Sequence, residues 1–436
     1  MRNLGACRSA ALAAAVLLAP LAAGAQVTTT APDKFDLQAI LKVAAKAPPL
    51  PEPAGTVVRV KTAEELREAA RAAEPGTTIL LADGRYDIDR LPIRADRLAL
   101  RGASGDREKV ILDGGGRFGR VVEIRGAKDL LIADLTVANA GQYGIFFYGD
   151  SDVQRLKVYN VKFHNCWVRG LKGTHAERIN DSYRRRHPPE TVRKIRPANG
   201  QVRYCLFVND RVNPHTRPYG GDYIGGMDMM WLKDWVIADN VFVNIRGRNG
   251  VGRGAIFIWV NSENVVAERN LIFHCDRGIC YGNPSGEPPH MTGGIVRNNF
   301  IVAGDSQAIE ICQTKNVLVA NNTIYSADPK RVAVQFHRRN EGARCISNLL
   351  RGQLEAPEQV EKAHNLMGEL SGFFVRPETG DLHLTGKAGD ALGKGKPLKE
   401  VAEDFDGRKR KSPPDVGADE YSLPAKTPPT PAAPGG

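Results

Sequence analysis

The chain has 436 residues, of which 42% are hydrophobic and 25% are charged, and its formal net charge is +11. This composition is ordinary for a soluble protein with a long core. The positive balance favours an anionic partner, which could be nucleic acid, a membrane surface or an acidic polymer. No stretch beyond the first 25 residues is long and apolar enough to predict a membrane span.

The N-terminal residues have the pattern of an export signal. Arg2 and Arg8 precede an apolar stretch at 10–21, and Ala23-Gly24-Ala25 forms a small-residue cleavage site. The alternative, a membrane anchor, would need about 20 apolar residues. We therefore expect residues 1–25 to be a signal peptide and the protein to be secreted or periplasmic.

Residues 26–55 are rich in Pro, Ala and Thr and are expected to form a linker. A strand is predicted at 56–60, and Thr62 begins a capping box that opens an Ala-rich helix ending before Pro75-Gly76. One helix at the start of a repeat protein can cover the open end of its core. The Pro-rich tail at 422–436 is expected to be disordered.

A repeat fills the chain beyond this helix. Apolar residues alternate up to a polar position, which is Asn in six of eight copies, and then alternate again. We measure the repeat at Asp134, Asn160, Cys205, Asn240, Asn270, Asn299, Asn322 and Asn348. Successive copies lie 23 to 45 residues apart, which is typical of a β-solenoid with loops of variable length. The predicted fold class is all-β: a single-stranded right-handed parallel β-helix with an N-terminal capping helix.

The six cysteines outside the signal segment permit disulfides in an exported chain, but a solenoid of this size needs none. No C-x-x-C pair occurs, so a zinc site with that spacing is unsupported. We expect the six to be small buried side chains inside the coils.

Each coil contains an earlier strand whose alternation predicts two rows of outward side chains. The first row is Phe146, Asp228, Phe257, Cys280, Glu310 and Gln335, and the second is Tyr148, Met230, Trp259, Cys312 and His337. Long insertions at 169–200, 209–226, 246–254 and 283–293 are expected just before this strand. Loops along one edge of a strand face would form the wall of a groove, where solenoids usually carry their function.

The opening segment at 62–86 resembles that of the secreted pectate-lyase-like β-helix proteins, and most closely the branch that holds alginate lyases and chondroitinases. Its features are Pro75-Gly76-Thr77-Thr78-Ile79 and Leu81-Ala82-Asp83-Gly84-Arg85-Tyr86. The segments 404–408 and 415–421 are similar to the closing motif of many bacterial members. The resemblance spans about 56–421 and implies the fold. The calcium-binding and catalytic motifs of that branch, and those of polygalacturonases and pectin esterases, have no counterpart here, so no catalytic residue is carried over.

The predicted groove edge is basic. The loop from Lys172 to Arg196 contains eight Lys or Arg against three acidic residues. Arginine binds carboxylate or sulfate bidentately, so this edge suits an acidic polysaccharide; the alternative is a solvated basic loop. The predicted substrate-binding residues are Arg246, Arg248, Arg277, His175 and the sugar-stacking aromatics Tyr148, Phe257 and Trp259. For the aromatics, the alternative is packing beneath the long loops.

β-Elimination from a uronate needs a cation at the carboxylate, a base for the C5 proton and an acid for the leaving oxygen. The candidate catalytic residues are His215, Arg217, Tyr219, Tyr223, Arg253 and His337. Asp222, Asp228 and Glu310 are candidate Ca²⁺ ligands, although no ligand spacing supports them.

The leading hypothesis is a monomeric secreted polysaccharide lyase that acts on a uronate-containing polymer and binds no nucleic acid. A hydrolase that uses Asp228 with Glu310 is disfavoured, because three strand spacings separate them by about 14 Å. A hydrolase with an acid pair from the loops, or a glycan-binding solenoid without catalysis, stays open.

Overall fold

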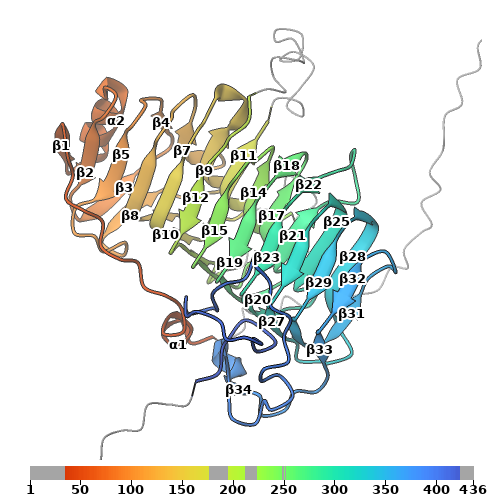
Figure 1. The fold of residues 1–436 in the computed structure, drawn as a ribbon. Helices are drawn as coiled ribbons and strands as arrows, with labels where there is room; N and C mark the ends of the chain where they lie inside the picture. Colours follow the sequence, from red (N-terminus) through yellow and green to blue (C-terminus); the bar gives the residue numbers. More distant parts are fainter. Residues whose placement is uncertain (1–34, 176–194, 212–222, 248–249, 251, 423–436) are drawn as a thin grey trace, which may run out of the picture. The chain divides into compact units, whose positions relative to one another are not determined.

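The computed structural model describes residues 35–175, 195–211, 223–247, 250 and 252–422. In this part of the chain, 21 strands form one sheet and 12 form a second, and the pairings within both sheets are parallel. The chain passes through both sheets once per coil, and Figure 1 shows the strands stacking in sequence order. The fold is a single-stranded right-handed parallel β-helix, as the sequence predicts.

The 21-stranded sheet, here called sheet A, contains two columns of strands, and β8 and β10 extend through both. The first column is β1 (Val57–Val60), β2 (Thr78–Leu81), β5 (Ala99–Gly102), β8 (Leu131–Ala138), β10 (Lys157–His164), β12 (Gln201–Arg203), β15 (Val236–Ala238), β19 (Val266–Glu268), β23 (Ile295–Arg297), β26 (Leu318–Ala320), β29 (Arg344–Ile346) and β32 (Glu361–Ala363). The second column is β3 (Gly84–Asp87), β6 (Val110–Asp113), β13 (Leu206–Val208), β16 (Val241–Val243), β20 (Leu271–Cys275), β24 (Phe300–Ala303), β27 (Thr323–Tyr325), β30 (Leu349–Arg351) and β33 (Leu366–Met367).

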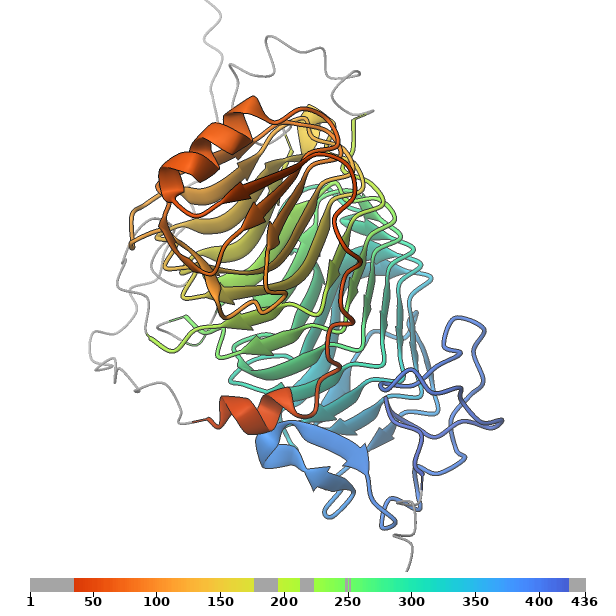
Figure 2. The same cartoon turned by 90° about the vertical axis from the view of Figure 1, so that its left-hand side faces the viewer.

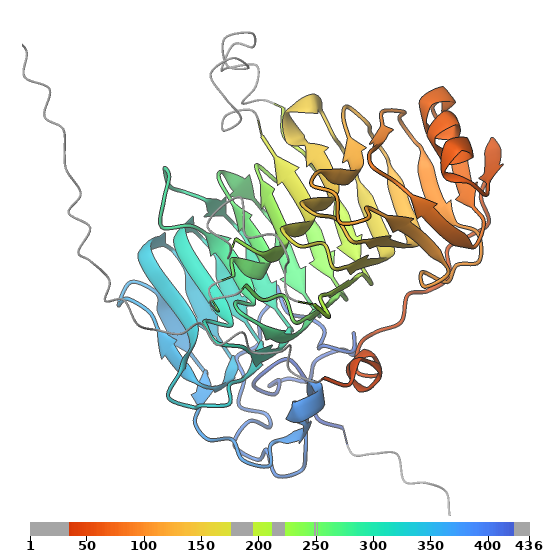
Figure 3. The same cartoon turned by 180° about the vertical axis from the view of Figure 1, so that it is seen from behind.

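Sheet B, the 12-stranded sheet, faces the other side of the core. Its strands are β4 (Leu91–Ile93), β7 (Arg120–Ile124), β9 (Tyr143–Tyr148), β11 (Arg169–Thr174), β14 (Gly225–Met230), β17 (Gly254–Trp259), β21 (Ile279–Gly282), β25 (Ile309–Lys315), β28 (Val332–Glu341) and β31 (Gln353–Glu355), with the short β18 (Ser262–Glu263) and β22 (Met291–Thr292). Figure 3 shows the same coils from behind. Alternate side chains point inward, so Ile145, Met229, Ile258 and Ile309 are fully buried in one core cluster.

A ladder of asparagines joins successive coils at the bend between the two columns of sheet A. Asn240, Asn270, Asn299 and Asn322 are buried, and each accepts the backbone N–H of the equivalent residue in the preceding coil. In the first two copies, the positions used to measure the repeat lie one residue before the level of the ladder. At that level Val161 pairs with Leu135, and Cys205 follows in the next coil. Asp134 and Asn160 instead lie one residue earlier, at positive φ. A short polar side chain tolerates that left-handed conformation.

Helix α2 (Ala63–Ala72) packs its buried Leu66 and Ala70 against the core cluster at the N-terminal end, and Figure 2 shows it over the first coils. The Thr62 side chain accepts the Glu65 N–H, as the predicted capping box requires. The six described cysteines are buried and free of disulfides. Four lie inside the coils, as predicted, whereas Cys280 and Cys312 lie on the outer side of sheet B. No described helix is long and apolar enough to span a bilayer.

The chain ends cover much of the outer face of sheet A. Helix α1 (Leu37–Leu41) places Ile40 in a cluster with Leu206, Val241 and Leu271 and with the C-terminal segment, which holds the hairpin β34 (Phe374–Arg376) and β35 (Asp381–Leu384). The segment expected to be a linker contacts the solenoid, because the Tyr159 hydroxyl donates a hydrogen bond to the Pro48 carbonyl. Two short 3₁₀ helices, Gly149–Ser151 and Pro377–Thr379, complete the described elements. The predicted outward row lies on the outer face of the other sheet, sheet B.

Candidate active site

Outward side chains of sheet B form one continuous row along the coils. Strand register aligns Glu123, Phe146, Lys172, Asp228, Phe257, Cys280, Glu310, Gln335 and Glu355. This confirms the predicted row. Three of its four acidic members, Glu123, Asp228 and Glu310, lie three strands apart, a spacing of about 14 Å, and the fourth, Glu355, lies two strands beyond Glu310.

The insertions do not all precede the sheet B strands, so that prediction is wrong. Residues 209–224 and 244–253 precede β14 and β17, whereas 175–200 and 283–290 follow β11 and β21. Residues 169–174, predicted to belong to an insertion, are strand β11 itself. Long connections therefore attach at both ends of the strands that carry the row.

Asp228 lies at the centre of a buried ion cluster on β14. Its Oδ2 is 2.8 Å from Lys172 Nζ and 3.2 Å from Arg169 Nε, and its Oδ1 accepts a 3.0 Å hydrogen bond from Trp259 Nε1. The side chains of Asp228 and Arg169 are 1% and 0% exposed, and that of Lys172 is 9% exposed. Burial raises the pKa of Asp228, but the charges of Lys172 and Arg169 outweigh it and the net pKa is lowered.

The backbone of Tyr223 helps to hold Arg169 in this cluster. Arg169 donates to the Tyr223 carbonyl, and its guanidinium lies 4.2 Å from the centre of the Tyr223 ring. One terminal nitrogen of Arg169, Nη2, is buried and has no hydrogen-bond partner. Burial raises the pKa of Tyr223, so its hydroxyl stays protonated at neutral pH.

Glu310 anchors a second ion cluster three strands along the row. Its carboxylate lies 2.9 Å from His337 Nε2, 3.4 Å from Arg277 Nε and 3.6 Å from Arg253 Nη1. Burial raises the pKa of Glu310, but the His337 hydrogen bond and the two arginines outweigh it, so the net pKa is lowered. Glu310 is therefore ionised and accepts from its neighbours.

His337 is the most exposed of these side chains, at 29%. Because the ionised Glu310 accepts a hydrogen bond from Nε2–H, neutral His337 has its lone pair on Nδ1. Nδ1 lies 4.0 Å from the Cys312 sulfur. Burial raises the pKa of the Cys312 thiol to about 12, so this thiol stays protonated and leaves the basic role to the imidazole.

Arg253 connects the two ion clusters. Its positive charge lowers the pKa of both Tyr223 and Glu310, and its guanidinium lies 4.5 Å from the centre of the Phe257 ring. Its Nε is buried without a hydrogen-bond partner. Arg169, Lys172, Arg253 and Arg277 carry four positive charges against the two carboxylates, so the paired clusters keep an excess of two. This stretch of sheet B suits an anionic ligand.

Two of the three aromatics predicted to stack on sugar rings are buried. Phe257 and Trp259 are 0% and 3% exposed and stack on each other with ring centres 5.0 Å apart. They pack beneath their neighbours because Trp259 donates to buried Asp228 and Arg253 covers Phe257. Tyr148 is partly exposed, accepts a hydrogen bond from Arg120, and lies under the Arg125 guanidinium at 3.7 Å.

The other predicted residues lie in different places. His175 is buried, stacks on Trp231 and hydrogen-bonds the Ile195 carbonyl through Nε2. Arg246 pairs with Asp276 and Asp305 at the start of the connection before β17. The remaining predicted residues, His215, Arg217, Tyr219, Asp222 and Arg248, lie outside the described residues.

Arg169 and Lys172 were not among the predicted site residues. A signal for them exists in the sequence: Tyr143 and Arg169 begin paired strands 26 residues apart, the same interval that separates Asp134 from Asn160. Extending that interval places Lys172 level with Phe146 in the outward row. The polar character of the segment masks its strand pattern.

Asp228 and Glu310 do not fit the predicted role of Ca²⁺ ligands. Calcium prefers six to eight oxygen ligands. Here cationic side chains lie against both carboxylates: Lys172 and Arg169 at Asp228, and His337, Arg277 and Arg253 at Glu310. A divalent cation would have to displace them, so no reaction step is assigned to one.

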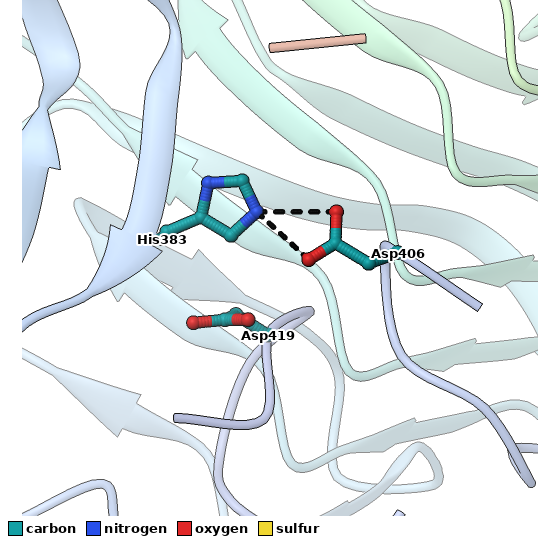
Figure 4. Close-up of side chains that lie close together, drawn as sticks. All are labelled: His383, Asp406 and Asp419. Atoms are coloured by element: carbon teal, nitrogen blue, oxygen red, sulfur yellow. Dashed lines mark hydrogen bonds and ion pairs between the residues drawn. The ribbon is translucent and has the colours of Figure 1, made fainter. Parts of the chain in front are cut away.

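One group with metal-like geometry lies in the C-terminal segment. Ligand atoms of His383, Asp406 and Asp419 lie within 4.8 Å of one another, the one such group in the described part of the chain (Figure 4). Arg408 pairs with both aspartates, and His383 Nδ1 also bonds Asp381 at 2.7 Å. Burial lowers the pKa of His383, but hydrogen bonds to Asp381 and Asp406 outweigh it and raise the pKa to about 10. Carboxylates contact both ring nitrogens of His383, Asp381 at Nδ1 and Asp406 at Nε2, so these residues and Arg408 form an ion network.

Comparisons with known proteins agree with the fold. No family model and no curated protein sequence matches the chain. Among solved structures, pectate lyase Pel9A matches 81% of this chain and 90% of its own at 13% identity and a TM-score of 0.50. An alginate lyase from Paenibacillus sp. str. FPU-7 matches 66% of this chain and all of its own at 11% identity and a TM-score of 0.42. The tailspike protein of E. coli bacteriophage HK620, in complex with a pentasaccharide, matches 73% of this chain and 60% of its own at 13% identity and a TM-score of 0.47. The likeness to Pel9A shows that the chain has the parallel β-helix fold of a pectate lyase.

Proposed function

We propose that the protein is a polysaccharide lyase that cleaves a uronate-containing acidic polysaccharide by β-elimination on the outer face of sheet B. The observation that carries the proposal is the Glu310 cluster, where an oriented histidine stands beside two arginines. A parallel β-helix is also a fold that a pectate lyase uses.

Each residue has one role in the proposed reaction. Arg253 and Arg277 bind the substrate carboxylate and stabilise the negative charge that develops when the C5 proton leaves. His337 takes that proton on Nδ1, while Glu310 holds Nε2 and stabilises the imidazolium. The C4–O bond breaks as the C4–C5 double bond forms, and the protonated Tyr223 hydroxyl gives its proton to the leaving oxygen.

A hydrolase that uses the acids of the row fits the geometry less well. Glycoside hydrolysis needs one carboxylic acid that is protonated at working pH. Asp228 and Glu310 both have lowered pKa values, and three strand spacings separate them. Both features disfavour either residue as the general acid.

The test is an ultraviolet absorbance assay for unsaturated uronates on alginate, pectate, chondroitin, heparan and ulvan-type polymers, with calcium and with chelator. The proposal expects a rise on at least one polymer that persists in chelator, since no step uses a metal. New reducing ends without the absorbance would assign a hydrolase. Retention of a polymer without turnover would assign a binding solenoid.

A further inference from the structure

A second hollow lies away from the sheet B row, at the corner where the second column of sheet A turns toward sheet B. Its volume is about 530 Å³, within the range of small-molecule sites. Its lining comes from five successive coils: Arg85, Asp87, Asp113, Gly115, Gly116, Arg117, Asn139, Trp167 and Arg211. None of these residues belongs to the Asp228 or Glu310 cluster.

The polar lining forms a connected network. Buried Asp113 pairs with Arg85 and accepts from the Gly115 N–H at 2.6 Å and from Asn139 Nδ2 at 3.0 Å. Asn139 Oδ1 in turn accepts from Arg211 at 2.8 Å. These bonds fix the direction of each group before any ligand arrives, which lowers the entropy cost of binding.

The three arginines of the lining face its two aspartates and Asp210, which lies beside Arg211 outside the lining, so the charges here are balanced, in contrast to those of the sheet B row. Arg85 pairs with Asp113, Arg117 with Asp87, and Arg211 lies 3.6 Å from an Asp210 oxygen. Such pairs offer donors and acceptors side by side without excess charge. A sugar hydroxyl both donates and accepts, so it matches them better than a carboxylate or phosphate does.

Aromatic surface completes the hollow. Trp167 lines it beside Gly116, where an added Cβ would lie 3.6 Å from the ring, and the Arg211 guanidinium lies 5.8 Å from the ring centre. Phe118 is not part of the lining, but it follows the lining residue Arg117 directly in the chain. It is 56% exposed, the highest value among the exposed large hydrophobic residues of the described chain. Flat apolar faces next to polar pairs suit the two-sided character of a pyranose ring.

We infer that this corner hollow is a binding site for an uncharged oligosaccharide, separate from the proposed catalytic row. Arg85, Asn139 and Arg211 bind its hydroxyls, and Phe118 and the edge of Trp167 contact its apolar faces. The inference does not depend on the lyase proposal, because it uses none of the same residues.

The test measures binding to the full chain by calorimetry and by saturation-transfer NMR. The probes are maltotriose, cellotriose, mannotriose and, as the acidic counterpart, trigalacturonate. At least one neutral trisaccharide is expected to bind, and Arg211→Ala and Phe118→Ala, both at exposed positions, should each weaken it by about tenfold or more. Two matched controls, Arg339→Ala on the exposed part of β28 and His337→Asn in the row, should bind it like the unaltered protein.

Three results would overturn the inference. They are no binding of any neutral probe, binding that Arg211→Ala and Phe118→Ala leave unchanged, and binding that only His337→Asn removes. Loss of binding in a variant counts only if its circular dichroism and melting temperature match those of the unaltered protein. If Arg211→Ala fails this check, Phe118→Ala decides the matter, because Phe118 makes no polar contact that the fold needs.

Discussion

Two buried carboxylates organise the chemistry of the sheet B row, and each is held ionised by the cations around it. Asp228 is 0% exposed and pairs with Arg169 and Lys172. Such a cluster gains little stability over an apolar one, but losing one partner leaves uncompensated charge in the interior. Its ion pairs fix the positions of Arg169 and Lys172 on a face with an excess of positive charge.

Replacing Asp228 with Asn should therefore destabilise the fold by about 3–5 kcal/mol, because Arg169 and Lys172 lose their buried counter-charge. Urea unfolding followed by circular dichroism measures this. The matched control is Glu341→Gln, which removes an exposed partner of Lys315 and should change stability by less than about 1 kcal/mol. Equal effects of the two changes would show that Asp228 is not a buried ion-pair centre.

Arg253 is expected to act on the substrate rather than on stability. Its Nε is buried without a partner, and a lysine would keep the charge but lose the forked pairing with a carboxylate. Arg253→Lys should lower kcat/KM by about tenfold or more and leave the melting temperature nearly unchanged. An unaltered kcat/KM would remove Arg253 from the substrate site.

At the scale of the element, the asparagine ladder joins successive coils through buried hydrogen bonds between amide side chains and backbone. Asn299 accepts the backbone and side-chain N–H groups of Asn270 and donates to the Ala267 carbonyl and to Asn322. All of these groups lie in the interior. Removing the amide leaves several buried polar groups without partners.

Asn299→Ala should accordingly cost about 2–4 kcal/mol of unfolding free energy, as several buried partners lose their hydrogen bonds. Asn160→Ala is the matched control, because Asn160 lies outside the ladder and bonds Asp134 at a partly exposed position. Its cost should stay near 1 kcal/mol. The two urea midpoints are then compared. A larger loss for Asn299→Ala shows that the hydrogen bonds of the ladder stabilise the solenoid, and equal losses would contradict this.

The repeat made the fold and the outward row predictable, because Ile145, Ile258 and Ile309 alternate with the row at a period of two. The site was predictable only in part. Glu310 and His337 follow from alternation on β25 and β28, but Arg169 and Lys172 lie in a strand with few apolar residues. The burial of Phe257 and Trp259 depends on contacts between coils, which a strand pattern does not contain.

At the scale of the whole molecule, the C-terminal segment packs on sheet A through apolar contacts and is held together by its own ion network. His383 bonds Asp406 (Figure 4) and Asp381, and its pKa is raised to about 10. Since its ordinary value is 6.5, the network stabilises the fold fully below about pH 6.5. This contribution is lost as the pH rises toward 10.

The melting temperature should thus fall between about pH 7 and pH 10, and it should fall further than in a variant without the His383 imidazole. Each unit of a raised pKa corresponds to about 1.4 kcal/mol of stability. His383→Gln should be less stable at pH 6 and should show a flatter profile over this range. His364→Gln is the control, since its imidazole bonds only the Lys394 carbonyl among its described contacts. Identical pH profiles for unaltered protein and His383→Gln would contradict this account.

The most direct test of the catalytic proposal compares the unaltered protein, His337→Asn and Arg339→Gln in the unsaturated-uronate assay on the same polymer. His337 and Arg339 share β28, but His337 pairs with Glu310, whereas Arg339 pairs with the exposed Glu341. The account predicts product from the unaltered protein and from Arg339→Gln, and a loss of about 10²- to 10⁴-fold in kcat for His337→Asn with KM little changed. Full activity in His337→Asn would contradict it, as would the absence of unsaturated product from the folded, unaltered protein on every polymer.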